Sequence, residues 1–81
     1  MDFEVEPGDV KAGQLWLYEC HMAGQHRVRD LLLVLERCRG FQRMGWMCYV
    51  SPMRGPKTKH RFEFFGVHEL SRFGTLVSDA P

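Results

Sequence analysis

The apolar residues of this chain gather in short runs, and the run at the centre decides the fold. Residues 31–35 are Leu-Leu-Leu-Val-Leu, flanked by Asp30 and Glu36. A run so short and so apolar on both sides is typical of a strand covered on its two faces, or of a turn or two of buried helix. Its expected packing partners are the aromatic residues on either side, Trp16, Trp46, Tyr49, Phe62, Phe64 and Phe65.

A helix over residues 28–39 is the alternative to a central strand. Apolar residues recur there at helical spacing, at Val28, Leu31, Leu32, Leu35 and Cys38. Gly40 stands where a helix C-cap would. Such a helix would turn Leu33 and Val34 to solvent and leave the neighbouring strands without a middle partner. We therefore predict a strand over residues 30–36.

Three further segments have the composition and alternation of strands, at residues 14–20, 44–51 and 59–65. The clearest is 44–51, which places Trp46, Cys48 and Val50 on one face and Met47, Tyr49 and Ser51 on the other. Pro52 is expected to end it, because proline cannot donate to a strand ladder. The expected connections are a long loop at 21–27, a basic turn around Gly40 at 37–43, and a loop at 53–58.

Residues 66–73 are too few for a stable free helix but suit a single helical turn that packs Val67, Leu70 and Phe73 inward. A last short strand is expected at 75–78. The sequence thus predicts an all-β fold, a small five-stranded barrel with one short helical turn before the last strand. We divide the chain into an acidic N-terminal arm at 1–13, the barrel domain at 14–78 and a C-terminal end at 79–81.

Length and cysteine usage limit the class of protein. With 81 residues the chain forms one domain at most, and a domain of this size has a thin margin of stability. Its three cysteines, Cys20, Cys38 and Cys48, form no CxxC pair, which is typical of free thiols in a reducing compartment. The acidic start differs from a signal peptide, and no apolar run approaches membrane-spanning length. We expect a cytoplasmic protein, in the cytosol or in a particle assembled there.

The net charge of +1 conceals an asymmetry along the chain. Four of the ten acidic residues fall in the first nine positions, at Asp2, Glu4, Glu6 and Asp9. Residues 27–61 hold nine basic residues against Asp30 and Glu36. Segregated charge of this kind creates a local field that the total does not show, although it also describes two solvated faces.

Four short sequence segments add a resemblance to a known family. It is carried by Lys-Ala-Gly-Gln-Leu-Trp at 11–16, the run at 31–36, Trp-Met-Cys-Tyr-Val at 46–50, and Glu69-Leu70 before the terminal strand. Over residues 10–78 the chain resembles the small SH3-like β-barrel proteins of tailed bacteriophages, departing from them in its longer first loop and acidic arm. The resemblance implies an SH3-like barrel with binding or structural work in a viral assembly, and fold alone does not fix function.

Metal and catalytic chemistry find weak support. Possible metal ligands are Cys20, His21, His26, Cys38 and Cys48, but their spacing is not that of a structural zinc site, so no metal and no cofactor are expected. Possible acid–base and phosphate-binding groups are His60, His68, Glu63, Glu69, Arg54 and Arg61. Gly13-Gln14-Leu15-Trp16 is similar to the opening of the MazF and PemK ribonuclease toxins. The matching catalytic arginine and threonine pair is not found, so we assign no catalytic residue.

Nucleic-acid binding is the stronger alternative. Basic residues cluster in two stretches predicted to lie on turns, with Phe41 and Trp46 interleaved, a combination that suits phosphate contact and base stacking. The candidates are Arg37, Arg39, Arg43, Arg54, Lys57, Lys59 and Arg61.

Protein docking is the favoured function. A barrel this small cannot hide all of its aromatic residues, and exposed aromatic, Met and Arg side chains are common at interfaces. The docking candidates are Phe3, Trp16, Tyr18, Phe41, Trp46, Tyr49 and Met53. An aromatic cage for methyl-lysine from Trp16, Tyr18 and Tyr49 is the specialised form of this hypothesis. We expect a non-enzymatic module that binds a protein partner or a second copy, with no membrane and no small-molecule substrate.

Overall fold

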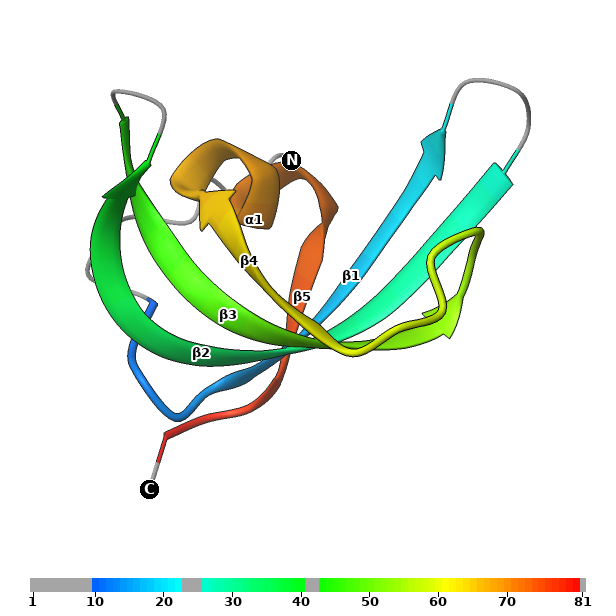
Figure 1. The fold of residues 1–81 in the computed structure, drawn as a ribbon. Helices are drawn as coiled ribbons and strands as arrows, with labels where there is room; N and C mark the ends of the chain where they lie inside the picture. The colour runs from blue at the N-terminus through cyan, green and yellow to red at the C-terminus, as the bar shows by residue number, and fades with distance from the viewer. Residues whose placement is uncertain (1–9, 23–25, 41–42, 81) are drawn as a thin grey trace.

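The fold is one curved sheet of five antiparallel strands with a single short helix. The computed structural model describes residues 10–22, 26–40 and 43–80. The strand order across the sheet is β4-β3-β2-β1-β5 (Figure 1). The elements are β1 (Leu15–Met22), β2 (His26–Gly40), β3 (Arg43–Arg54), β4 (Arg61–Gly66), α1 (Val67–Phe73) and β5 (Gly74–Ser78). None of the described helical residues forms a segment long and apolar enough to cross a membrane.

The central apolar run is extended, as predicted. It lies in β2, which pairs with β1 on one side and β3 on the other. The all-β class, the number of strands and the helical segment before the last strand are also confirmed. The sheet is not closed, however, because β4 and β5 are its two edges and no pairing joins them in the described part of the chain. The structure is therefore a strongly curved open sheet (Figure 1).

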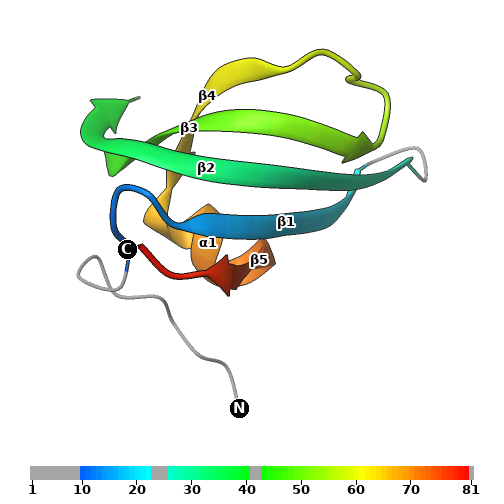
Figure 2. The ribbon, with the colours of Figure 1, turned by 90° about the horizontal axis from the view of Figure 1, so that it is seen from below.

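The two faces of the sheet have different environments. Directly opposite residues on antiparallel strands point to the same face, and the register aligns Trp16 with Leu32 and Leu32 with Val50. All three are buried and belong to the core, which α1 completes with Leu70 on the concave side of the sheet (Figure 1). The alternate residues of the same strands point to the convex side. Figure 2 looks onto this side, with the strands in front of α1.

Gln14 links the segment before β1 to the segment after β5. Its side-chain oxygen accepts hydrogen bonds from the Lys11 amide at 2.8 Å and the Trp16 indole at 3.0 Å, while its amide nitrogen donates to Asp79 at 2.8 Å. The chain turns sharply just before it, at Gly13, whose φ of 92° favours glycine. A buried amide with all its groups used fixes the position of β1 beside the C-terminal segment.

Several predicted boundaries are wrong. β1 runs on to Met22 and β2 begins at His26, so the connection between them is shorter than the predicted loop at 21–27. β2 extends to Gly40 and β3 begins at Arg43, so the connection is shorter than the predicted basic turn at 37–43. Pro52 does not end β3, which continues to Arg54.

Proline is tolerated within β3 for a local reason. Pairing of β3 with β4 stops at Val50, so Pro52 has no strand neighbour on that side. On the other side it lies opposite Asp30, next to a register shift between Arg29 and Asp30. Prolines in sheets are confined to edges and bulges, and Pro52 occupies such a place.

A close approach of strands requires glycine at position 45. Gly45 lies opposite Gly66, and the Phe64 ring covers it. A Cβ atom at Gly45 would collide with the backbone oxygen of Phe65 and with this ring. At Gly66 the nearest atoms to a Cβ are instead the end of the Arg43 side chain, 3.2 Å away, which can move.

We predict that Gly45→Ala lowers the free energy of unfolding by about 2 kcal/mol, because the added methyl group forces a shift of strand backbone. Gly66→Ala is the control, since its methyl group displaces only a flexible side chain, and it should have a smaller effect. Urea unfolding followed by circular dichroism measures both. Equal losses in the two variants would show that the close approach is not what requires glycine.

Candidate functional site

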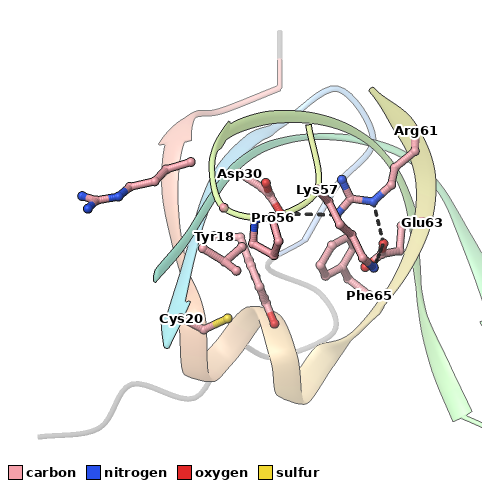
Figure 3. Close-up of a pocket in the computed structure, with 11 residues that line it drawn as sticks. Tyr18, Cys20, Asp30, Pro56, Lys57, Arg61, Glu63 and Phe65 are labelled. Atoms are coloured by element: carbon pink, nitrogen blue, oxygen red, sulfur yellow. Dashed lines mark hydrogen bonds and ion pairs between the residues drawn. The ribbon is translucent and has the colours of Figure 1, made fainter. Parts of the chain in front are cut away.

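A charged cavity opens on the concave side of the sheet. Its volume is about 160 Å³, and residues from β1, β2, β4 and the loop after β3 line it. The apolar part of the wall includes Tyr18, Pro56 and Phe65, whereas the charged part includes Asp30, Arg61 and Glu63 (Figure 3). The cavity therefore combines aromatic surface with a small ionic network.

Arg61 is the centre of that network. Its Nε donates to Glu63 at 2.8 Å and its Nη2 donates to Asp30 at 3.4 Å (Figure 3). The Asp30 side chain is only 4% exposed, compared with 22% for Arg61 and 36% for Glu63. Lys57 adds a weaker contact to Glu63, at 4.0 Å. Asp30 is thus the one deeply buried charge among these four.

Burial is the main influence on the Asp30 carboxyl. Loss of solvent raises the pKa of Asp30, and the nearby Arg61 guanidinium lowers it by a smaller amount. A carboxylate with a raised pKa is less stable in the folded protein than in water. The negative charge of Asp30 therefore weakens the fold, in spite of its ion pair with Arg61.

Tyr18 anchors the aromatic wall of the cavity. Its ring meets Phe65 edge-on at 5.0 Å between centroids and Phe73 at 5.6 Å, so it joins β1 to β4 and α1. Burial is the main cause that raises the pKa of Tyr18 far above its usual value. A neutral phenol between two aromatic rings contributes mainly to packing.

The convex side of the sheet carries a second candidate surface. A row of apolar residues crosses four strands, because Leu15 lies opposite Leu33, Leu33 opposite Tyr49, and Tyr49 opposite Phe62. We call these four residues the convex row. Leu17, Leu31, Met47 and Phe64 flank it on the same face. The solvent face of an antiparallel sheet is usually polar, so this apolar surface is unusual.

The convex row is most exposed at its β4 end. Phe62 is 67% exposed, and its ring meets Tyr49 edge-on at 5.2 Å. The His60 ring lies 5.8 Å from Tyr49 on the same surface. Beside Phe62 runs a shallow groove that includes Met47 and Phe64, with Arg39 and Lys57 among its lining residues. Exposed aromatic surface and positive charge therefore meet at this end of the sheet.

The structure divides the predicted docking residues. Trp16 and Trp46 are 4% and 8% exposed and belong to the core, so their side chains are not available to a partner. Burying two indoles is possible because both lie on the concave face, where Trp16 is opposite Leu32 and Trp46 is opposite Phe65. Tyr49 lies on the convex face, and Met53 is 59% exposed. Phe3 and Phe41 lie outside the described residues.

The same register excludes the aromatic cage that was considered as a special form of docking. Trp16 and Tyr18 point to the concave face of β1, whereas Tyr49 belongs to the convex row. Three side chains on opposite faces of one sheet cannot surround a single methylammonium group. Sequence reasoning also did not identify four members of the candidate sites: Asp30 of the cavity, and Leu15, Leu33 and Phe62 of the convex row. The alternation around Phe62 was visible, but only the strand order places it in line with Leu33.

The predicted basic residues also divide into two groups. Those with exposed positions and no ion pair recorded in the described chain are Arg37, Arg39, Arg54 and Lys59. Arg43 is bound to Glu69 and lies 5.6 Å from the centre of the Phe64 ring. Arg61 serves the cavity network, and Lys57 lies near Glu63.

The described residues contain no group of three or more potential metal ligands. Burial raises the pKa of the Cys48 thiol to about 12, so at neutral pH it is protonated and a poor ligand. The two glutamates considered for acid–base work, Glu63 and Glu69, each pair with an arginine. No protein-family model matches this chain, and comparisons with curated proteins and with solved structures likewise give no match.

We predict that Asp30→Asn stabilises the protein at neutral pH, because asparagine keeps the shape of the side chain and removes the buried charge. Since the folded pKa of Asp30 is raised, the wild type loses stability as the pH rises through the range between the ordinary and the raised value. Below that range both forms are uncharged, and the gain should vanish. Unfolding free energies measured across acid to neutral pH give the difference.

Glu63→Gln is the matched control, because it removes a partly exposed carboxylate that binds the same guanidinium. It should give no comparable gain at neutral pH. A loss of stability in Asp30→Asn at neutral pH would show instead that the ion pair with Arg61 outweighs the burial of the charge.

Proposed function

We propose that this protein is a non-enzymatic docking module that attaches to a larger protein assembly through the convex face of its sheet. The observation that carries the proposal is the convex row, with Leu15, Leu33, Tyr49 and Phe62 aligned across a face that α1 does not cover. An apolar surface of this kind on a small domain favours burial against another protein. A particle of a tailed bacteriophage is the setting that the sequence resemblance suggests.

The charges around the convex row define the chemistry of the partner. Arg39 and Lys57 line the groove at its β4 end. At the β1–β2 end of the same face, Glu19 and Arg29 neutralise each other in an ion pair at 3.0 Å. Glu63 also lines the groove at the β4 end and lies 4.0 Å from Lys57, so Arg39 is the basic residue there for which the described residues show no ion pair. A complementary partner has an apolar centre and acidic residues that meet Arg39 and Lys57.

We predict that Leu33→Glu abolishes capture of the partner, because it places a charge in the middle of the convex row. The wild type, Leu33→Glu and the control Leu76→Glu are tagged, expressed in the native host and purified with their bound proteins, which mass spectrometry quantifies. Leu76 is an exposed leucine that lies opposite Trp16, on the other face of the sheet. A partner should be recovered with the wild type and the control, and depleted at least about tenfold with Leu33→Glu.

Circular dichroism of the purified variants must show that each remains folded. Recovery of the same protein in equal amounts with folded Leu33→Glu would mean that the convex face is not the docking surface.

Nucleic-acid binding is the second candidate function, and one observation favours it. The rings of His60, Tyr49 and Phe62 form a contiguous aromatic surface, next to a groove whose lining includes Arg39 and Lys57. Aromatic platforms beside positive charge bind single strands by stacking and phosphate contact. Arg61 is not part of this surface, because its guanidinium is held by Asp30 and Glu63.

For this candidate we predict that the wild type binds a labelled single-stranded oligonucleotide with an affinity that falls as salt rises, and leaves the oligonucleotide intact. The double variant Arg39→Glu with Lys57→Glu should lose the binding, whereas reversal of Arg72, on α1, should not. Fluorescence anisotropy at several salt concentrations measures the affinities. No salt-dependent binding by the wild type would eliminate this function and leave protein docking unaffected.

A further inference from the structure

The outer edge of β4 is open in the part of the chain that the structure describes. β4 lies at one end of the strand order, and its recorded ladder is with β3. In the described ranges, no other strand pairs with it. The edge of a sheet presents backbone N–H and C=O groups that can pair with another strand. Proteins usually protect such an edge with charge, proline or a covering segment, whereas β4 carries Phe62 with 67% of its surface exposed.

The sequence of β4 is complementary to itself. If two β4 strands pair antiparallel with Phe62 on the two-fold axis, each Phe62 lies opposite its counterpart. Each Arg61 then lies opposite Glu63 of the partner subunit. Opposite charges stabilise cross-strand pairs and aromatic residues pack well there, whereas like charges repel. Within each subunit Arg61 already donates to Glu63 at 2.8 Å, so pairing across the axis brings four partly exposed charged groups together with their signs alternating.

Neighbouring registers lack this complementarity. Shifting the pairing by two residues in one direction places Arg61 opposite Arg61, and shifting it in the other direction places Glu63 opposite Glu63. A shift by one residue turns Phe62 toward the face that carries the charges of the other strand. Among these registers, the one centred on Phe62 is therefore the one that pairs Arg61 with Glu63 and sets the two Phe62 rings side by side.

We infer that two copies of this chain associate along β4, with Phe62 at the two-fold axis. The pairing joins two sheets of five strands into one. It also makes the convex row continuous across both copies, because Phe62 is the last residue of that row. Such an interface is isologous, so it closes at a dimer and does not propagate into fibres. The inference does not depend on the proposed docking function, since it concerns the edge of the sheet and not its face.

Sedimentation equilibrium of the full chain over a wide range of concentrations tests this inference. The average mass of the wild type should rise from that of a monomer toward that of a dimer. Phe62→Lys should remain a monomer throughout, because two charges would meet on the axis. Val77→Lys is the matched control: it changes an exposed apolar residue of the opposite edge strand, β5, and should associate like the wild type.

A charge exchange tests the register. Glu63→Arg places arginine opposite Arg61 of the partner subunit and should weaken association about tenfold, because two unfavourable pairs replace two favourable ones. The triple variant Arg61→Glu, Glu63→Arg and Asp30→Asn restores opposite charges across the axis without setting a second carboxylate beside that of Asp30, and should recover association. Circular dichroism separates these effects from unfolding.

A wild type that stays monomeric at its highest soluble concentration would overturn the inference. So would association that Phe62→Lys leaves unchanged, or association lost equally in Val77→Lys. In each case Leu33→Glu still reports separately on docking, since Leu33 lies on β2, away from the open edge.

Discussion

One helix covers one face of this sheet, and most other features follow from that constraint. The core consists of concave residues of four strands, β1 to β4, together with Val10 and with Leu70 of α1. α1 is seven residues long, enough to cover part of the concave side. The chain nevertheless places leucine and aromatic residues on both sides of its strands, as in β2, where Leu32 is buried and its neighbours Leu31 and Leu33 are partly exposed. The convex face is therefore apolar without an intramolecular partner, which a marginally stable small domain retains at some risk of aggregation.

On the concave side, the unfavourable feature is a buried charge. There a carboxylate lies almost fully buried, although burial raises its pKa and so opposes folding. Arg61 compensates in part, and the same arginine is bound to Glu63 on the edge strand. This network ties β2 to β4 over β3, between two strands that do not pair with each other. It thus supports the curvature of the sheet on its concave side.

The sequence was sufficient for the class of fold because the signals for strands are local. The alternation at Trp46, Cys48 and Val50, and the apolar run in β2, specify strands without knowledge of their neighbours. Features that depend on pairing were not predictable in the same way. Pro52 remains within β3 because it lies opposite a register shift in β2. The sheet stays open because its edge strands, β4 and β5, do not pair in the described residues. Trp16 and Trp46 were expected to pack against the central run and were also named as docking candidates, because composition alone does not tell which face a large aromatic residue occupies.

The position of Phe62 connects the face and the edge of the sheet. A stable protein interface usually buries roughly 800 Å² on each partner. The convex row of a single copy crosses four strands and ends at an exposed ring on the edge, which is a small surface for that purpose. Two copies joined along β4 would bury both Phe62 rings against each other and present two convex rows in line, doubling the apolar surface without any change in fold. Pairing along the edge and docking through the face would then reinforce each other, because the partner binds the combined surface more tightly than either half.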